Sequence, residues 1–279
     1  MKRTLLNLTL CGSSAVPTEA KPVAEQVGTV HTGTFRLPGH ERPQAVRYEV
    51  VNGFAVMEGD VILGKTGVLG RATPGVGLEA QANALPGEGY RWPGGVVPYT
   101  VDPSVSAAGR ENIRRATLHW QRQTPFRFVS RRSQKSYVTF TRGVAANACY
   151  SEIGRQGGRQ YVFLNASGTC SERLLVHEIG HTVGLWHEHS RRDRDAWVRV
   201  DYNSVVGGQA YNFDKTGAAG QGVGPYDYCS VMHYSAYAFS VGFRPTLELL
   251  QPHRCAQPVG WADRLSPGDV AAARRLAGR

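Results

Sequence analysis

The segment from His177 to Glu188 constrains the fold of this chain more than any other. On an α-helix with 3.6 residues per turn, His177 and His181 lie on the same face, and an imidazole pair at this spacing can bind one tetrahedral zinc ion. His187 cannot reach that face from the same helix. The helix must therefore end near Gly184, because glycine readily adopts the positive φ that turns the chain back. The spacing predicts a three-histidine zinc site with one coordination position left for water.

Glu178 follows the first histidine and would lie beside the ion. Zinc lowers the pKa of a bound water to about 7, and a neighbouring carboxylate can accept the proton. A zinc site with only a structural role needs no such base. Glu178 therefore favours a hydrolase over the alternative function, a zinc-containing module that binds a polyanion or a protein with little turnover. The remaining alternative is a polar helix with solvated histidines. It would require all the fixed residues of the motif to coincide by chance, which is rare.

The whole pattern, His-Glu-x-x-His-x-x-Gly-x-x-His, resembles the metzincin clan, and the Glu188 that follows resembles the astacin family of zinc endopeptidases. The segment 226–234 is similar to the astacin Met-turn. The resemblance implies that Met232 lies beneath the metal. It also implies that Tyr234 is a movable metal ligand, which can donate a hydrogen bond to the developing oxyanion. From the residues alone, both would be interpreted as packed core side chains.

The resemblance covers residues 83–279 and implies an α+β, metzincin-like (zincin-like) catalytic domain of two subdomains with the zinc ion in the cleft between them. Local patterns predict strands at 96–101, 126–129, 137–140 and 161–164, and helices at 106–123, from 171 and at 266–276. The family's edge strand corresponds to 161–164. We therefore expect a protein or peptide substrate to add near 161–165 as an antiparallel strand.

Two further regions precede this domain. Residues 1–14 resemble a weak signal or lipoprotein-like leader, in which Cys11 is a candidate lipid anchor. Residues 15–82 are predicted to be a pro-segment. They are rich in Pro, Gly and charged residues, so we expect no core of their own, although residues 48–64 have a strand-like composition.

Within the pro-segment, Asp60 closes a Met-Glu-Gly-Asp sequence that resembles the astacin Phe-x-Gly-Asp motif, with Met57 in the place of Phe. The resemblance implies a zymogen in which Asp60 binds zinc in place of water, a role that suits a carboxylate. A β-turn with an exposed aspartate is the alternative.

The resemblance also gives Glu188 a role after cleavage, as the partner of the new N-terminal amine, which would lie near residues 82–84. In a chain that is never cut, Glu188 would instead form a salt bridge at the end of the helix, with Arg191 or Arg192 as candidate partners.

The chain has five cysteines, an odd number that limits the disulfides within it to two. The resemblance implies a Cys149–Cys170 bridge. The second bridge of the family is missing at both ends, so Cys229 and Cys255 are free to pair with each other, although sequence alone does not fix the connectivity. Disulfides suit an oxidising compartment, and we expect a secreted or cell-envelope protein.

A net charge of +10 and a pI near 9.6 indicate acidic partners, including acidic peptides, to which Arg244 could contribute. A solvated basic surface is the simpler explanation. The basic residues lack interleaved aromatics, so no nucleic-acid partner is expected. No stretch reaches the 18 or so apolar residues of a membrane helix. We expect a monomer with one catalytic Zn²⁺.

Overall fold

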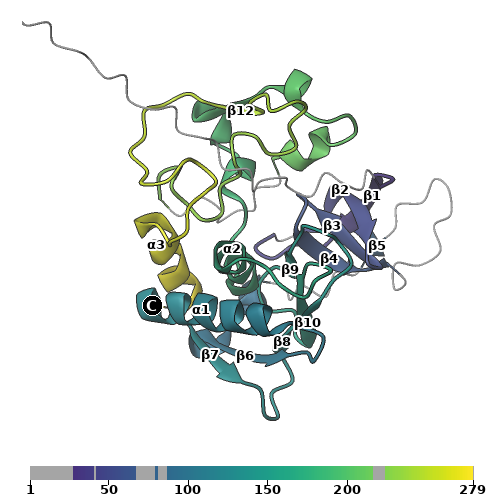
Figure 1. The fold of residues 1–279 in the computed structure, drawn as a ribbon, viewed down its shortest axis with the longest axis vertical. Coiled ribbons are helices and arrows are strands. Elements are labelled where there is room, and N and C mark those ends of the chain that lie inside the picture. Colours follow the sequence, from purple (N-terminus) through teal and green to yellow (C-terminus); the bar gives the residue numbers. More distant parts are fainter. Residues whose placement is uncertain (1–27, 41, 67–78, 81–86, 216–223, 279) are drawn as a thin grey trace, which may run out of the picture.

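The computed structural model describes residues 28–40, 42–66, 79–80, 87–215 and 224–278. Cys11 and the rest of the predicted leader lie outside these residues, as does the expected cleavage region at 82–84. Figure 1 shows the N-terminal strands at one side, the helix of the zinc motif near the centre and the C-terminal segment around β12 beyond it.

Among the described residues, ten strands form one mixed sheet in the order β5-β1-β2-β3-β4-β9-β10-β8-β6-β7. Four strands precede residue 66, and a two-residue strand follows at 79–80. The bounds of these five are His31–Phe35 (β1), Gln44–Val51 (β2), Phe54–Met57 (β3), Val61–Lys65 (β4) and Glu79–Ala80 (β5). The others are Val96–Val101 (β6), Arg127–Ser130 (β7), Tyr137–Arg142 (β8), Tyr150–Glu152 (β9) and Arg159–Leu164 (β10).

Three α-helices accompany this sheet in the described part of the chain: Ala107–Gln123 (α1), Glu172–Val183 (α2) and Pro267–Leu276 (α3). A separate pair of short strands, Val198–Val200 (β11) and Leu247–Leu249 (β12), is antiparallel. Short 3₁₀ turns lie at Gly87–Tyr90, Pro93–Gly95, Glu188–Ser190, Arg194–Ala196, Tyr202–Ser204 and Ala210–Phe213. This mixed composition agrees with the expected α+β class.

The local predictions for the catalytic region are confirmed. The four predicted strands correspond to β6, β7, β8 and β10, and the three predicted helices to α1, α2 and α3. Each helix begins after a serine whose hydroxyl accepts a backbone hydrogen bond, as expected of an N-cap. These caps are Ser106, Ser171 and Ser266.

One large core joins α1, α2 and α3 to one face of the sheet. Trp120 of α1 is fully buried at its centre, and its indole nitrogen donates a hydrogen bond of 2.9 Å to the carbonyl of Val176 in α2. A second core lies in the C-terminal segment and contains Phe213, Tyr234 and Leu247. The zinc-motif helix therefore belongs to the first core, whereas the Met-turn tyrosine belongs to the second.

The expectation that residues 15–82 lack a core is wrong for 31–65. Strands β1 to β4 form consecutive antiparallel pairs, and their apolar side chains are buried together. Phe35 and Val61 are fully buried in this cluster, which also takes in Trp186 from the segment after α2. The segment thus completes its core partly with catalytic-domain residues, a contribution that its own sequence cannot reveal.

The edge of the catalytic sheet is β9 rather than the 161–164 strand that we predicted. β10 lies inside the sheet, paired in parallel with β8 and antiparallel with β9. The free side of β9 is taken by β4 in parallel orientation, with Val61 opposite Ser151. β9 is only three residues long, so these residues carry no strand signal of their own. The predicted site of substrate addition therefore moves to Ser151 and its neighbours.

Both expected disulfides are present, between Cys149 and Cys170 and between Cys229 and Cys255. The first fixes the start of β9 to the residue that precedes the cap of α2. The second ties the Met-turn to the loop after β12.

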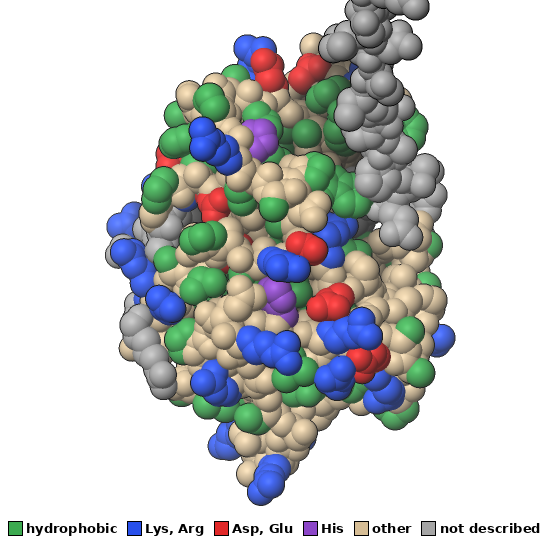
Figure 2. All heavy atoms as spheres, turned by 60° about the vertical axis from the view of Figure 1, so that its left-hand side comes forward, with side chains coloured by type: hydrophobic (Ala, Val, Ile, Leu, Met, Phe, Trp, Pro, Cys, Tyr) green, Lys and Arg blue, Asp and Glu red, His purple; other side chains and the backbone are tan. Residues whose placement is uncertain are grey.

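On the face drawn in Figure 2, the basic side chains are scattered and do not gather in one patch. Figure 2 shows Lys and Arg side chains spread over the face that includes α1 and α3, with Asp, Glu and apolar side chains between them. On α1, Glu111 pairs with both Arg114 and Arg115. No helix in the described ranges has the length and apolar character needed to cross a membrane.

Candidate active site

Helix α2 and the turn after it bring the three histidines of the motif together. His177 and His181 lie one turn apart on α2, which ends at Gly184 with φ of 112°, as predicted. His187 follows in the returning segment. The centroids of the three rings lie between 4.7 and 5.2 Å apart, so the histidines form one cluster.

The orientation of the three imidazoles suits a metal ion. Each Nδ1 is directed to an oxygen outside the cluster, which leaves the Nε2 atoms facing one another; those of His177 and His187 are 3.2 Å apart. Nε2 of His181 is buried and has no hydrogen-bond partner in the described structure. Outer-sphere acceptors of this kind fix the tautomer of a metal-binding histidine. They are the carbonyls of Val231 (2.6 Å) and Leu185 (2.9 Å) and Oε2 of Glu58 (2.6 Å).

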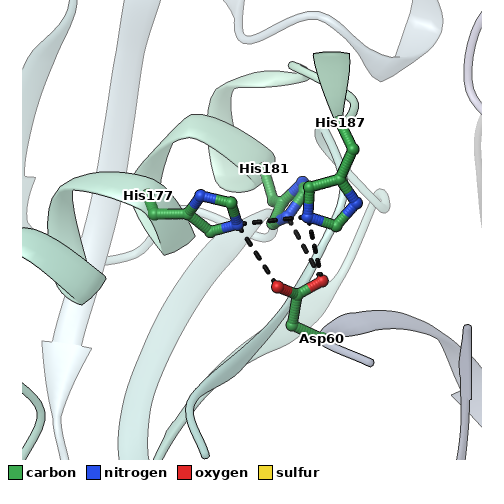
Figure 3. A group of neighbouring side chains, drawn as sticks. All are labelled: Asp60, His177, His181 and His187. Carbon is green, nitrogen blue, oxygen red and sulfur yellow. Dashed lines mark hydrogen bonds and ion pairs between the residues drawn. The ribbon is translucent and has the colours of Figure 1, made fainter. Parts of the chain in front are cut away.

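Asp60 completes this cluster from the N-terminal strands. Its two carboxylate oxygens lie 3.2 to 3.6 Å from the Nε2 atoms of His177, His181 and His187 (Figure 3). The four side chains together could hold a metal ion, and three imidazoles with one carboxylate are donors that suit zinc. Burial alone would raise the pKa of Asp60, but the charge of His187 and hydrogen bonds from the imidazoles hold it well below its usual range.

A tight turn between β3 and β4 presents Asp60 to the histidines. Glu58 and Gly59 both have positive φ, 47° and 73°. A side chain on Gly59 would approach the ring of Phe239 within 2.8 Å. Both this close approach and the positive φ favour glycine over any other residue at this position. The exposed-turn alternative for Asp60 is wrong, because the turn is packed into the catalytic part.

Sequence reasoning missed Glu58. Its side chain is 1% exposed, its carboxylate pairs with Nδ1 of His187, and its backbone carbonyl accepts a hydrogen bond from the Tyr234 hydroxyl. Burial lowers the pKa of His187, but Asp60 and Glu58 outweigh that effect and raise it to about 10. No local signal distinguishes Glu58 from an exposed turn residue, because its partners are far away in the chain.

Glu178 lies on α2 next to the first histidine and is 1% exposed. Its Oε2 atom is buried without a hydrogen-bond partner among the described residues. Burial raises the pKa of Glu178 well above its usual range, and the negative charge of Asp60 raises it further. A carboxyl group with a raised pKa can hold a proton as well as accept one.

The Met-turn packs directly against α2. A side chain at Gly180 would approach Sδ of Met232 within 2.4 Å, so the methionine packs directly on the helix between the two histidine turns. Tyr234 is 8% exposed, and its ring is T-shaped against His187 at 4.8 Å. Burial raises the pKa of the Tyr234 hydroxyl well above its usual value.

His189 lies in the short 3₁₀ turn that follows the zinc motif. It is fully buried and stacks on the Tyr234 ring at 3.5 Å, and its Nε2 is 3.1 Å from the carbonyl of Asn212. His233 is also buried and lies 2.8 Å from the Tyr226 hydroxyl.

Glu188 is paired in the uncut chain. Its Oε1 atom accepts hydrogen bonds of 2.9 Å from Arg191 and 2.8 Å from the backbone of Asp227. Burial raises the pKa of Glu188 to about 7, although Arg191 opposes the rise. The salt bridge expected for an uncut chain is therefore formed with Arg191.

This geometry agrees with the comparison with known families. The family model described as Astacin, a peptidase family, matches residues 85–276. The chain belongs to the astacin family. The match begins close to the expected domain boundary and includes every histidine of the cluster, whereas Asp60 and Glu58 lie outside it.

Curated proteins with similar sequences agree with this assignment. Zinc metalloproteinase nas-6 of Caenorhabditis elegans is 37% identical over 196 residues, which are 70% of this chain and 56% of that protein. Tolloid-like protein 1 of Mus musculus is 30% identical over 256 residues, 88% of this chain and 25% of that protein. The chain thus spans about half or less of the length of these two relatives.

Among solved structures, high choriolytic enzyme 1, a hatching enzyme zinc-protease from Oryzias latipes, is similar with a TM-score of 0.58 and 31% identity. The alignment covers 66% of this chain and 89% of the hatching enzyme. The astacin fold of the catalytic part therefore has a direct structural counterpart.

Proposed function

We propose that this astacin-family protein is a zinc-dependent endopeptidase made as a zymogen. The observation that carries the proposal is the convergence of three imidazole Nε2 atoms beside the buried carboxyl group of Glu178, whose Oε2 atom has no hydrogen-bond partner among the described residues. His177, His181 and His187 would hold the metal. Zinc bound there would polarise the scissile carbonyl and lower the pKa of the attacking water.

Glu178 acts as general base and then as general acid. Its carboxylate takes the proton of the attacking water, and its carboxylic acid form delivers that proton to the leaving amine. The buried setting that raises its pKa supports both roles, because the group must hold the proton between the two steps.

Tyr234 stabilises the oxyanion. Its hydroxyl binds the Glu58 carbonyl in the full chain, and removal of residues 15–82 frees it for a hydrogen bond to the tetrahedral intermediate. The Tyr234 ring stacks on the buried ring of His189. Met232 supports the histidine helix from below through its contact at Gly180.

Residues 15–82 act as the inhibitory pro-segment, with 83–279 as the catalytic domain. Two contacts support this role: Asp60 occupies the space between the three Nε2 atoms, and β4 covers the free side of β9. The backbone N–H of Ser151 donates to the Asp60 carbonyl at 2.8 Å, so an edge-strand donor next to the histidines is already used. A substrate would occupy the same edge in the opposite direction, as an antiparallel strand.

Processing near residues 82–84 completes activation. Glu188 then exchanges part of its present hydrogen bonding for the new N-terminal amine. The raised pKa of Glu188 supports this exchange. It shows that Arg191 does not fully offset the cost of burying the carboxylate, and a second cation would stabilise its charged form further.

The substrates are proteins or peptides, and acidic segments would be favoured by a surface with net charge +10. Two disulfides support a secreted or envelope location, where Cys11 is the proposed lipid anchor. We propose a monomer with no nucleic-acid partner.

The decisive experiment combines peptide cleavage with zinc content. It compares the full chain, the chain after cleavage by an added protease in the segment before Tyr90, and the cleaved chain with Glu178→Gln. We expect one zinc in each, cleavage only by the processed wild type, and a loss of at least about 10³-fold on Glu178→Gln. If no form cleaves a broad peptide library while all hold one zinc, the protein is a binding module and the proposal fails.

A further inference from the structure

The edge of the catalytic sheet carries a group of four side chains outside the histidine cluster. Tyr150 of β9 lies opposite Phe163 of β10, and the same register brings Glu152 opposite Tyr161. Opposite residues of an antiparallel pair, and alternate residues of one strand, share a face of the sheet. Ser151, between Tyr150 and Glu152, points to α2, where its hydroxyl lies 3.1 Å from that of Thr182. The four side chains therefore lie on the face turned away from α2.

The N-terminal strands cover this face. The Phe54 ring packs edge-on against Tyr161 at 5.7 Å and Phe163 at 5.1 Å, and Ile62 lies opposite Glu152 in the parallel β4–β9 pair. Phe54, Ile62 and Phe163 belong to one buried cluster, against which Tyr161 packs, and this cluster joins the two parts of the chain. Release of residues 15–82 would uncover the face next to the edge strand.

Lys65 places a cation on this surface. Its Nζ atom lies 5.9 Å from the centre of the Phe54 ring and 6.0 Å from that of Tyr161, both within cation–π range. Among the described residues, a second cation at the Tyr161 ring is Arg159, whose guanidinium lies 4.9 Å from the ring centre. The Tyr161 ring therefore already makes cation–π contacts with basic side chains in the full chain.

Glu152 supplies the carboxyl group of this surface. Its side chain is 8% exposed, and its Oε2 accepts a hydrogen bond of 2.6 Å from the backbone N–H of Tyr161. Burial raises the pKa of Glu152 to about 8, and the backbone hydrogen bond and the positive charge of Lys65 oppose that rise. A cation that approaches this buried carboxyl group is bound favourably, because it stabilises the charged form that burial disfavours.

We propose that Glu152 and Tyr161 form a subsite of the processed protein for a lysine or arginine side chain of the substrate, which takes the place that Lys65 holds in the full chain. This inference rests on the proposed function, because the pro-segment must leave first. It adds a selectivity for a basic residue that the overall charge of the protein does not predict.

The direction of the strands sets the position of that basic residue. Along β4 the chain runs from Asp60, at the histidines, to Lys65, in parallel with β9. A substrate strand antiparallel to β9 runs the other way. Its residue over Glu152 and Tyr161 therefore lies a few positions N-terminal to the cleaved bond.

The test measures cleavage selectivity with the full chain processed by an added protease. One set of peptides carries lysine, and its matched set glutamine, at each of several positions N-terminal to the cleaved bond. We expect lysine to raise kcat/KM about tenfold at one position. This is the effect expected from the free energy of one hydrogen bond to a charged group. Glu152→Gln should reduce that ratio to within twofold. Glu248→Gln, on β12, is the matched control and should keep the full ratio.

A binding measurement separates this inference from the proposed function. Fluorescence anisotropy of labelled peptides on processed Glu178→Ala protein requires no turnover. Lysine-dependent binding that Glu152→Gln removes supports the subsite even if no peptide is cleaved, in which case the endopeptidase proposal alone fails. Cleavage with an equal preference in wild type and Glu152→Gln overturns the subsite alone.

Tyr161→Leu covers the case in which Glu152→Gln does not fold. It keeps the carboxyl group and removes the ring, and it should lower the lysine preference about threefold. A lysine preference that is unchanged by Tyr161→Leu, with Glu152→Gln unfolded, overturns the proposal.

Discussion

Phe54→Ala removes the ring that packs β3 against the outer face of β10. Phe54 is 7% exposed, and both of its closest aromatic partners, Tyr161 and Phe163, belong to the catalytic part. Truncation of a buried phenylalanine costs about 3 kcal/mol or more. Because the lost contacts lie across the junction, most of this cost falls on docking of the pro-segment. Each 1.4 kcal/mol is a factor of ten, so the undocked fraction should rise about 100-fold.

The assay is cleavage of a fluorogenic peptide by the intact full chain, with mass spectrometry at each time point to verify that the chain has not been cut. Residual activity of the intact chain should rise about 100-fold relative to wild type. Val50→Ala, at an exposed position of β2, is the control and should change nothing. If intact Phe54→Ala has wild-type residual activity while the processed wild type is fully active, apolar docking at β10 does not hold the pro-segment closed and the reasoning is refuted.

Three more outcomes follow from single contacts. Tyr234→Phe in the processed protein should lower kcat about 10²-fold with KM within twofold, because the hydroxyl acts only on the oxyanion; a change confined to KM would contradict this. Burial raises the pKa of Glu152 from 4.5 to about 8, so the folded state binds the extra proton and its stability should fall as pH rises from 4.5 to 8. Urea unfolding at pH 5 and 8 should show a smaller loss for Glu152→Gln, and an equal loss would refute the assignment. Replacing Cys229 and Cys255 by serine opens a bridge across a sequence separation of 26 and should lower the free energy of unfolding by about 3 kcal/mol; no change in urea unfolding would contradict it.

The central helix could be predicted from sequence because its determinants are local. Ser171 caps its start, Gly184 ends it, and the spacing of His177 and His181 follows from helical periodicity alone. The turn that carries Asp60 was recognised through a short motif, which is also a local property.

The edge strand and the N-terminal core could not be predicted in the same way. β9 has three residues, and it exists as a strand because β4 and β10 pair with both of its sides. The core of β1 to β4 is completed by Trp186, from the segment that follows α2. A short or incomplete element has too little pattern of its own, since its stability comes from partners elsewhere in the chain.

By itself, the sequence determined the chemistry of the site: which side chains can bind zinc, which carboxyl group lies beside them, and which aspartate can reach them. The tertiary structure alone decided what surrounds that chemistry. Glu58 contacts His187, His189 stacks on Tyr234, and Lys65 lies over Tyr161. Backbone propensity and periodicity act over one or two turns, whereas burial and charge pairing depend on which distant segments the fold brings together.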